Sequence, residues 1–301
     1  MEMKKFGVVG AGMMGAEIAL CFAQAGYETV LGDIKLEFAE NGKKRLDGML
    51  AKRVAKGKMT EEEKTAAMNN IKVTCTADSV ADYADCDLIV EAALEVFEIK
   101  SDIFKRLDEV CKESTIIASN TSSISITKLS TAVSAARAPR FIGLHYNSPA
   151  SIMKLVEVIP AVNTSAETTE ACKEILKKIG KEPVQCKDVV GFGLNRLFHC
   201  FYLEACRLVE EGVCTVEDVD KICLYGLGHP QGIFKLLDML NLELSVTVDK
   251  IMFEAYGDRF RPSAEMQRLV YAGHLGKKTG SGFYDWDENG KVIGMSAYYR
   301  K

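Results

Sequence analysis

The sequence feature that most constrains the fold is a glycine motif near the amino terminus. The run KKFGVV has the apolar character of a buried strand, and GAGMMG follows it at once, before the helical pattern AEIALCFAQAG. Gly10, Gly12 and Gly15 therefore stand in GxGxxG spacing between a strand and a helix. There the first glycine permits a tight turn, the second lets a pyrophosphate approach the backbone, and the third lets helix pack on strand. The motif, with Met13 and Met14 at the helix start, predicts a dinucleotide site.

An acidic residue in the next strand indicates which dinucleotide binds. The segment YETVLGD reads as a second strand and ends at Asp33, eighteen residues after Gly15. A carboxylate there would accept hydrogen bonds from the adenosine ribose hydroxyls and repel a 2′-phosphate, so we expect NAD rather than NADP. The positive charge of Lys35 nearby would instead favour a 2′-phosphate, and so NADP. The alternative is a glycine-rich turn followed by an ordinary surface aspartate.

Composition sets the broad class of protein. The chain has 301 residues, 48% hydrophobic and 27% charged, as expected for a globular protein with room for two domains. Its formal net charge of −4 gives no electrostatic reason to expect nucleic acid or a membrane as a partner. No apolar run approaches the ~18 residues of a membrane-spanning helix. Ten cysteines without a CxxC pair favour reduced thiols in a cytoplasmic protein, and we expect no metal.

Residues 36 to 70 have a polar, helical pattern. Four basic residues gather within it, namely Lys52, Arg53, Lys56 and Lys58. One interpretation is a solvated helical excursion. The other is a site for a phosphorylated substrate such as coenzyme A, with Lys56 as a candidate contact.

The strand DLIVEA is nearly all apolar, which is typical of a parallel strand covered on both faces. An amphipathic helix follows, with Glu95 before it and Lys100 near its start. These two side chains could form a surface charge pair of little energetic weight. They could also contact a cofactor, because they follow the carboxyl end of a sheet strand, where cofactors bind in such folds.

Two further strands end in polar residues. TIIAS leads into Asn120, Thr121, Ser122 and Ser123, a cluster that turn chemistry and helix capping explain more often than catalysis does. RFIGLH then brings His145 to the end of a strand, the usual place for chemistry in an open α/β sheet. His145 is therefore either a catalytic base or a core histidine near a strand.

Taken together, these segments strongly resemble the L-3-hydroxyacyl-CoA dehydrogenase family, particularly the stand-alone bacterial 3-hydroxybutyryl-CoA dehydrogenases. The matching motifs occur in family order and cover essentially the whole chain: GAGMMG, VEAALEVFEIK, ASNTSS, GLH with MKLVEVI, KDVVGFGLNR, EEGVCTVEDVD, GLGHP and LGKKTGSGFYDW. So many spaced motifs together make the resemblance highly specific.

The resemblance implies an NAD-dependent oxidoreductase that interconverts a short-chain L-3-hydroxyacyl-CoA and the 3-oxoacyl-CoA, a reaction of fatty acid and butyrate metabolism. It implies that His145 is the general base and that Glu157 binds its other ring nitrogen. It also implies that Ser122 and Asn195 hydrogen-bond the reacting substrate. A histidine suits this role because it titrates near neutrality and can take the hydroxyl proton or return it.

On the cofactor side, the resemblance implies that Glu95, Lys100 and Asn120 lie at the NAD. It also implies a homodimer. Apolar rows such as LVYAGHL and IFKLLDML in the carboxyl-terminal part agree with association through that part.

The chain departs from the family pattern beside the histidine. The family usually reads HFFNP, whereas this chain has HYNSP, so Ser148 replaces the family's substrate-contacting asparagine. Serine is shorter and offers fewer hydrogen bonds than an amide, and Asn147 could substitute only if the loop shifted. Downstream, GHPQGIF replaces the usual GHPMGPF. Both changes hint at an atypical acyl group or altered activity.

The predicted fold is α/β, with a Rossmann-like dinucleotide-binding domain over residues 1–186 and an all-helical domain over residues 187–301 for substrate binding and dimerisation. The remaining histidines, His199, His229 and His274, are expected to have structural roles. Two alternative functions stay open. One is a dehydrogenase of a free 3-hydroxy acid or of an atypical acyl-CoA, and the other is a catalytically silent NADH-binding protein.

Overall fold

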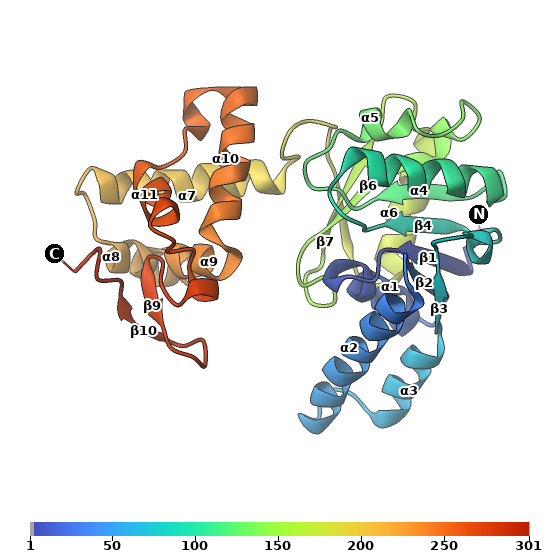
Figure 1. Ribbon diagram of the computed structural model, residues 1–301, viewed down its shortest axis with the longest axis horizontal. Coiled ribbons are helices and arrows are strands. Elements are labelled where there is room, and N and C mark those ends of the chain that lie inside the picture. Colours follow the sequence, from blue (N-terminus) through green and yellow to red (C-terminus); the bar gives the residue numbers. More distant parts are fainter. Residues whose placement is uncertain (1–2, 301) are drawn as a thin grey trace. The chain divides into compact units, whose positions relative to one another are not determined.

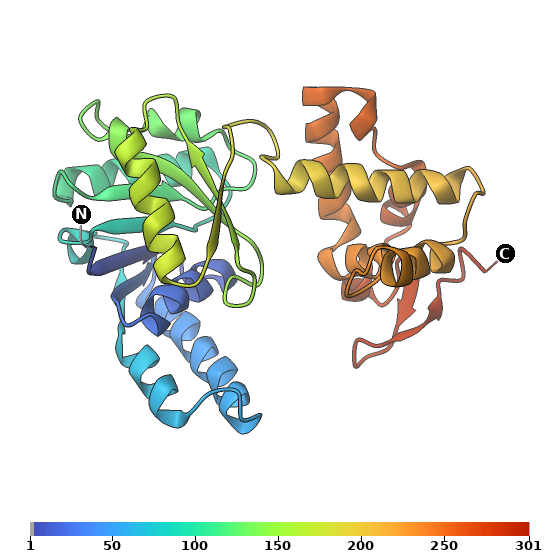
Figure 2. The same ribbon diagram turned by 180° about the vertical axis from the view of Figure 1, so that it is seen from behind.

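The structure, a computed structural model, describes residues 3–300 and separates into two compact units, Met1–Phe192 and Gly193–Lys301 (Figures 1 and 2). The predicted boundary after residue 186 lies six residues earlier, within the segment that leaves the last strand of the first unit. Within the described residues, no helix is both long and apolar enough to cross a membrane.

The first unit is built on one sheet of eight strands in the order β3-β2-β1-β4-β5-β6-β7-β8. The strands are β1 (Lys5–Val9), β2 (Glu28–Asp33), β3 (Ile71–Cys75), β4 (Leu88–Glu91), β5 (Ile116–Ser119), β6 (Phe141–Tyr146), β7 (Leu155–Pro160) and β8 (Glu182–Gln185). Neighbours pair parallel except β6 and β7, which are antiparallel. The order 3-2-1-4-5-6 confirms the predicted Rossmann-like domain and places the carboxyl ends of β1 to β6 at one edge.

Helices cover both faces of this sheet. They are α1 (Met13–Gln24), α2 (Leu36–Ala55), α3 (Glu61–Asn69), α4 (Phe97–Val110), α5 (Ile126–Ser130) and α6 (Ala166–Lys178). Side chains of α1 and α6 share one apolar cluster with Phe6 and Val8 of β1, whereas α4 and α5 share the other with Val9. Figure 1 shows α4 and α5 in front of the sheet, and Figure 2 shows α6 on the opposite face. Successive strand residues therefore serve two separate cores.

The second unit contains α7 (Leu194–Glu210), α8 (Val216–Lys221), α9 (Ile233–Leu240), α10 (Leu242–Tyr256) and α11 (Ala264–Tyr271). Tyr202, Phe234 and Phe260 are among its fully buried side chains. His199, for which we expected a structural role, is buried in the core of this unit: it is 5% exposed and its Nδ1 lies 2.7 Å from the Asp249 carboxylate.

The second unit is helical up to its tail, but the prediction of an all-helical domain needs one correction. The strands β9 (Tyr284–Trp286) and β10 (Val292–Met295) form a small antiparallel sheet. Their β-prone side chains flank DENG, and an Asn-Gly pair favours a tight reversal. The buried Asp238 of α9 fixes this tail, because its carboxylate accepts hydrogen bonds from Phe283 N, Tyr284 N and Trp286 Nε1, each at 2.9 Å.

Candidate active site

The predicted phosphate loop joins β1 to α1. Gly10 has φ +101°, and a Cβ there would lie 2.6 Å from the Ala92 carbonyl oxygen. A Cβ at Gly15 would lie 1.8 Å from the Gly10 carbonyl oxygen, so no side chain fits at the helix–strand contact. A Cβ at Gly12 would meet nothing within 4 Å. The three glycines thus have the turn, packing and open-approach roles that a pyrophosphate site needs.

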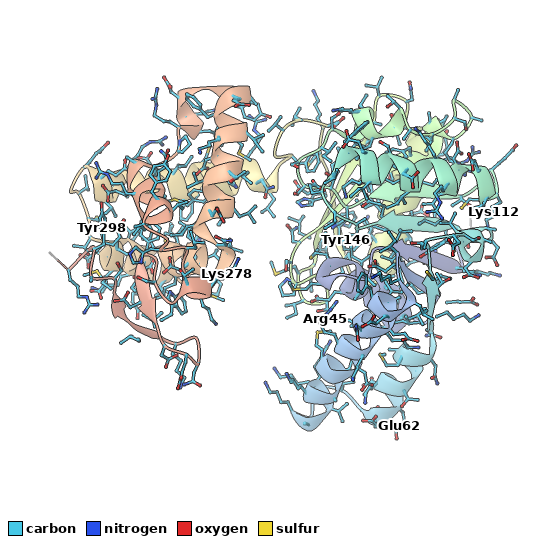
Figure 3. All side chains as sticks on the ribbon, viewed as in Figure 1. Arg45, Glu62, Lys112, Tyr146, Lys278 and Tyr298 are labelled. Atoms are coloured by element: carbon cyan, nitrogen blue, oxygen red, sulfur yellow. The ribbon has the colours of Figure 1, made fainter. Side chains whose placement is uncertain are left out.

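The helix α1 begins at Met13 with no side chain capping its first amides, and Met13 is 63% exposed. Met14, the next residue, is partly buried against the core. Free amides at a helix start attract anions. Arg45 of α2 anchors the loop from the other side, since its guanidinium donates to the Ala11 carbonyl at 3.2 Å (Figure 3).

Asp33 ends β2 beside this loop. One carboxylate oxygen accepts the Ala11 amide at 2.7 Å and the other accepts the Ile34 amide at 2.8 Å. Asp33, Gly10 and Gly12 line a cavity of about 810 Å³ together with residues of β4's exit loop and α4. A cavity of this size is in the range of cofactor sites. The arrangement fits the adenosine half of NAD, with the Asp33 carboxylate held for ribose hydroxyls.

Lys100 lies in a buried charge cluster. Its side chain is 1% exposed, and its ammonium lies 2.7 Å from Glu91 Oε1 and 3.2 Å from Glu95 Oε2. Glu91 is fully buried, and its other oxygen accepts the Ser119 hydroxyl at 2.7 Å. Burial raises the pKa of Glu91, while Lys100 and Ser119 act against that rise. Lys100 is therefore more than a surface charge pair with Glu95, because a buried carboxylate fixes its position.

Glu95 organises the polar loop after β5. Its Oε1 accepts hydrogen bonds from the Ser122 amide at 3.0 Å, the Ser123 amide at 3.0 Å and the Ser123 hydroxyl at 2.9 Å. The Thr121 hydroxyl donates to the same oxygen. Burial acts to raise the pKa of Glu95, but the Lys100 charge and these donors hold it below its usual value. Ser122 itself is exposed, with its hydroxyl carried on a loop that Glu95 fixes.

Asn120 connects the ends of two strands. Its backbone N–H donates to the Glu91 carbonyl at 2.8 Å, and its side-chain oxygen accepts a hydrogen bond from the Tyr146 backbone N–H at 2.8 Å. Asn120 therefore ties β4, β5 and β6 together at the carboxyl edge of the sheet. Its predicted contact with the cofactor is compatible with that position and stays a prediction.

His145 and Glu157 form a close pair. Antiparallel pairing of β6 with β7 sets the two residues directly opposite, and His145 Nδ1 lies 2.8 Å from Glu157 Oε2. His145 is 8% exposed and Glu157 is 1% exposed. A carboxylate at Nδ1 places the ring proton there, so Nε2 carries the lone pair. The pair thus has the geometry of a base whose tautomer is fixed by an acid.

The exit segment after β8, residues 186–192, contacts both members of this pair. The Cys186 thiol donates to Glu157 Oε1 at 3.3 Å. The Phe192 ring, 4% exposed, has its centroid 5.6 Å from that of the His145 imidazole. Phe192 has φ +44°, a left-handed conformation that costs a bulky residue about 1–3 kcal/mol.

The loop between β6 and β7 carries the departure from the family pattern. Ser148 is exposed and precedes Pro149 through a cis peptide bond. The Asn147 amide group donates to the Leu155 carbonyl at 3.2 Å, so it is engaged with β7. Glu17 of α1 holds the far side of the loop, since its carboxylate accepts the Ser151 amide at 2.9 Å and its hydroxyl at 2.8 Å.

Two further predicted residues are Lys56 and Asn195. Lys56 is the C-cap residue directly after α2 and is exposed. Asn195 stands in the first turn of α7, in the second unit. Among residues 3–300, no group of three or more His, Cys, Asp or Glu side chains is arranged to hold a metal ion.

Sequence reasoning gave no role to Glu91, Ser119, Cys186 or Phe192. A signal existed for Glu91, because an acidic residue that ends an otherwise apolar strand is buried only when it is paired. For Phe192 the signal was the flanking GFG, which indicates an unusual backbone but gives no contact. The contacts of Ser119 and Cys186 come from strand order, which spacing does not reveal.

Two family models match the chain. The model for the NAD binding domain of 3-hydroxyacyl-CoA dehydrogenase matches residues 5–189, and the model for the C-terminal domain of the same enzymes matches residues 191–286. The two matches meet within the junction between the two units.

Individual relatives agree with the family models. A probable 3-hydroxybutyryl-CoA dehydrogenase of Deinococcus radiodurans is 42% identical, over 94% of this chain and 100% of that protein. The mitochondrial hydroxyacyl-coenzyme A dehydrogenase of Sus scrofa is 40% identical, over 94% and 91%. The crystal structure of (S)-3-hydroxybutyryl-CoA dehydrogenase from Ralstonia eutropha matches with a TM-score of 0.89 at 36% identity, over 95% of this chain and 100% of that one. The chain therefore belongs to the 3-hydroxyacyl-CoA dehydrogenase family of NAD-dependent oxidoreductases.

Proposed function

We propose that this enzyme interconverts a short-chain L-3-hydroxyacyl-CoA, 3-hydroxybutyryl-CoA first among them, with the corresponding 3-oxoacyl-CoA. The observation that carries the proposal is the His145–Glu157 pair at the carboxyl edge of a sheet whose first strands form a dinucleotide site. The names of the Deinococcus and Ralstonia relatives support the short acyl chain.

His145 acts as the general base in this proposal. With Nδ1 donating to Glu157, the free lone pair of Nε2 takes the C3 hydroxyl proton in oxidation and returns it in reduction. Glu157, nearly fully buried, stabilises the imidazolium that forms. Bound NAD⁺ supplies the hydride acceptor for this reaction.

Glu95, Lys100 and Asn120 serve the cofactor side in this proposal. The Lys100 ammonium sits between two carboxylates, so it is fixed before any ligand binds. Such preorganised charges stabilise a bound group without reorganising during the reaction. When NAD is bound, the amides of Met13 and Met14 at the start of α1 would hold its pyrophosphate, and the Asp33 carboxylate would select NAD over NADP by repelling a 2′-phosphate.

The substrate contacts we propose are Ser122, Ser148 and Asn195, with Lys56 toward the coenzyme A phosphates. Ser122 and Ser148 are exposed on loops of the first unit, and Lys56 is an exposed basic residue. Ser148 offers one hydroxyl where the family has an amide, which supports a weaker hold on a standard acyl group.

The test is oxidation of NADH with acetoacetyl-CoA by the wild type and by His145→Gln. Loss of the base predicts a rate lower by roughly 10²–10⁴-fold. His229→Gln, which changes an exposed histidine of the second unit, is the matched control and should keep the wild-type rate. Unchanged turnover by His145→Gln would overturn the assignment of the base.

A comparison of turnover with different substrates distinguishes the alternative functions. Efficient turnover of 3-hydroxybutyryl-CoA contradicts the idea of an atypical acyl group. Saturation by the free 3-hydroxy acid, but not by its thioester, would select the dehydrogenase of a free acid. Tight NADH binding without turnover of any hydroxyacyl-CoA would select the silent binding protein, which the intact His145–Glu157 pair disfavours.

We also propose a cytoplasmic homodimer associating through the second unit. This unit exposes several large apolar side chains, among them Leu197 at 75% and Tyr225 at 85% exposure, and apolar surface of this kind can serve association when it is contiguous. All ten cysteines are free thiols, as a reducing compartment would keep them. Light scattering after size-exclusion chromatography tests the dimer, and a monomer mass at micromolar concentration would contradict it.

A further inference from the structure

Phe192 has a backbone conformation that its residue type disfavours. Among residues 3–300, only Phe192 and Asn241 combine a side chain with positive φ. Asn241 is a residue that tolerates this region, and its side chain caps α10 by accepting the Glu243 amide at 3.0 Å. Phe192 has no such local reason. Its neighbours are Gly191, with φ +72°, and Gly193, so the chain uses glycine on both sides of it but not at the disfavoured position.

The contacts of the Phe192 ring explain why position 192 has phenylalanine rather than glycine. It is 4% exposed, it belongs to the apolar cluster on the α4 and α5 face, and it lies against the imidazole of His145 with an interplanar angle of 57°. Glycine at position 192 would remove the backbone strain, but it would also remove the aromatic ring that contacts the imidazole. The strained conformation is therefore associated with a contact to the proposed base.

Residues 186–192, the segment that carries Phe192, contact the rest of the first unit at two positions before Phe192. The Cys186 thiol donates to Glu157 Oε1. The Asp188 carboxylate accepts the Thr127 amide at 2.8 Å and the Ile126 amide at 3.0 Å, at the start of α5. The same seven residues therefore contact the carboxylate behind the imidazole and the face of the imidazole itself.

We propose that Phe192 is a positioning residue for His145. The hydrogen bond to Glu157 fixes one atom of the imidazole, Nδ1, and leaves the ring free to tilt about that atom. The Phe192 ring limits this tilt, so that Nε2 keeps one direction toward the substrate hydroxyl. Small misplacements of a reacting group lower rates steeply, so loss of the ring lowers kcat more than it lowers binding. This inference rests on the proposed role of His145.

The test compares substitutions at Phe192 with a core control, using NADH and acetoacetyl-CoA. Phe192→Leu should lower kcat about 10- to 100-fold while KM for NADH stays within about threefold. Phe192→Tyr keeps an aromatic ring and should restore most of the activity. Phe104→Leu is the matched control: Phe104 is fully buried in the same apolar cluster and pairs with Phe141. It should lose thermal stability but keep its kcat.

Phe192→Gly is a second variant for the case that Phe192→Leu misfolds, because φ +44° is unstrained for glycine. It should fold and should have a kcat at least as low as that of Phe192→Leu. Wild-type kcat in either Phe192→Gly or Phe192→Leu, with His145→Gln inactive, would overturn this inference alone. Wild-type turnover by His145→Gln would overturn the proposed base and this inference with it. An equal loss of kcat in Phe104→Leu would show a general packing effect and also overturn it.

Discussion

Tyr146 follows the proposed base and contains a buried hydroxyl that the structure leaves without a hydrogen-bond partner. The side chain is 2% exposed and lies in the apolar cluster of the α1 and α6 face, in the interior of the first unit (Figure 3). Burial, together with Cys21 and Cys172, raises the pKa of this hydroxyl well above its usual value, so it stays neutral. We predict that Tyr146→Phe stabilises the first unit.

The magnitude follows from two opposing terms. An unsatisfied buried polar group costs about 1–3 kcal/mol, which the substitution recovers. The void left by one oxygen, roughly 10 Å³, costs only about 0.2 kcal/mol. The hydrogen bond from the Tyr146 amide to Asn120 is retained because it uses the backbone. We expect a net gain of about 1 kcal/mol or more, which raises the midpoint of thermal unfolding by about 2–4 °C per kcal/mol in a unit of this size.

Tyr83→Phe is the matched control. Tyr83 is also fully buried in the first unit, but its hydroxyl donates to the Val8 carbonyl at 2.9 Å. Its loss should destabilise by about 0.5–1.5 kcal/mol. Far-UV circular dichroism should monitor unfolding in urea, since the single tryptophan, Trp286, reports on the other unit. If Tyr146→Phe lowers the free energy of unfolding as Tyr83→Phe does, the reasoning about the unpartnered hydroxyl is wrong.

Two further substitutions test the polar loops. Ser148→Asn should raise kcat/KM for acetoacetyl-CoA about 2- to 10-fold, because the amide can add one hydrogen bond to the substrate. An unchanged kcat/KM would show that Ser148 does not limit the reaction. The pKa of Glu95 lies below its usual value, so its stabilising contribution is present at neutral pH and is lost as the pH falls through that lowered pKa. Glu95→Gln should therefore reduce the free energy of unfolding at pH 7 and have a progressively smaller effect as the pH falls through that lowered pKa. A loss that stays constant across the acid range would contradict an electrostatic origin.

The dinucleotide half of the site could be predicted from sequence because each of its signals is local. Gly10, Gly12 and Gly15 act within one turn, and their conformations and crowding are those that the motif requires. Asp33 needs only the next strand to be parallel and adjacent, which is the common arrangement for consecutive strands. Local signals of this kind survive without knowledge of the rest of the fold.

The charge cluster around Lys100 could be predicted only in part. Glu95 and Lys100 are close in sequence, and a charge pair was one of two interpretations of them; their charged groups lie 3.2 Å apart. The shorter contact, from Lys100 to Glu91 at 2.7 Å, was not predicted, because it joins the last residue of an apolar strand to a side chain of the following helix. Which residue pairs with such a carboxylate depends on the direction of α4, and periodicity does not give that direction.

The His145–Glu157 pair shows what the fold adds to a motif. A separation of twelve residues is compatible with a parallel crossover, a hairpin or no contact at all. The antiparallel pairing of β6 with β7 makes them neighbours, and the flanking buried pairs Leu144–Val158 and Tyr146–Val156 fix the register. A slip of one residue would set a valine opposite the histidine and turn Glu157 to the other face of the sheet. The proposed chemistry therefore depends on the apolar residues of two strands as much as on the histidine, and substitutions at Val156 or Val158 that weaken this register should reduce activity without touching a polar group.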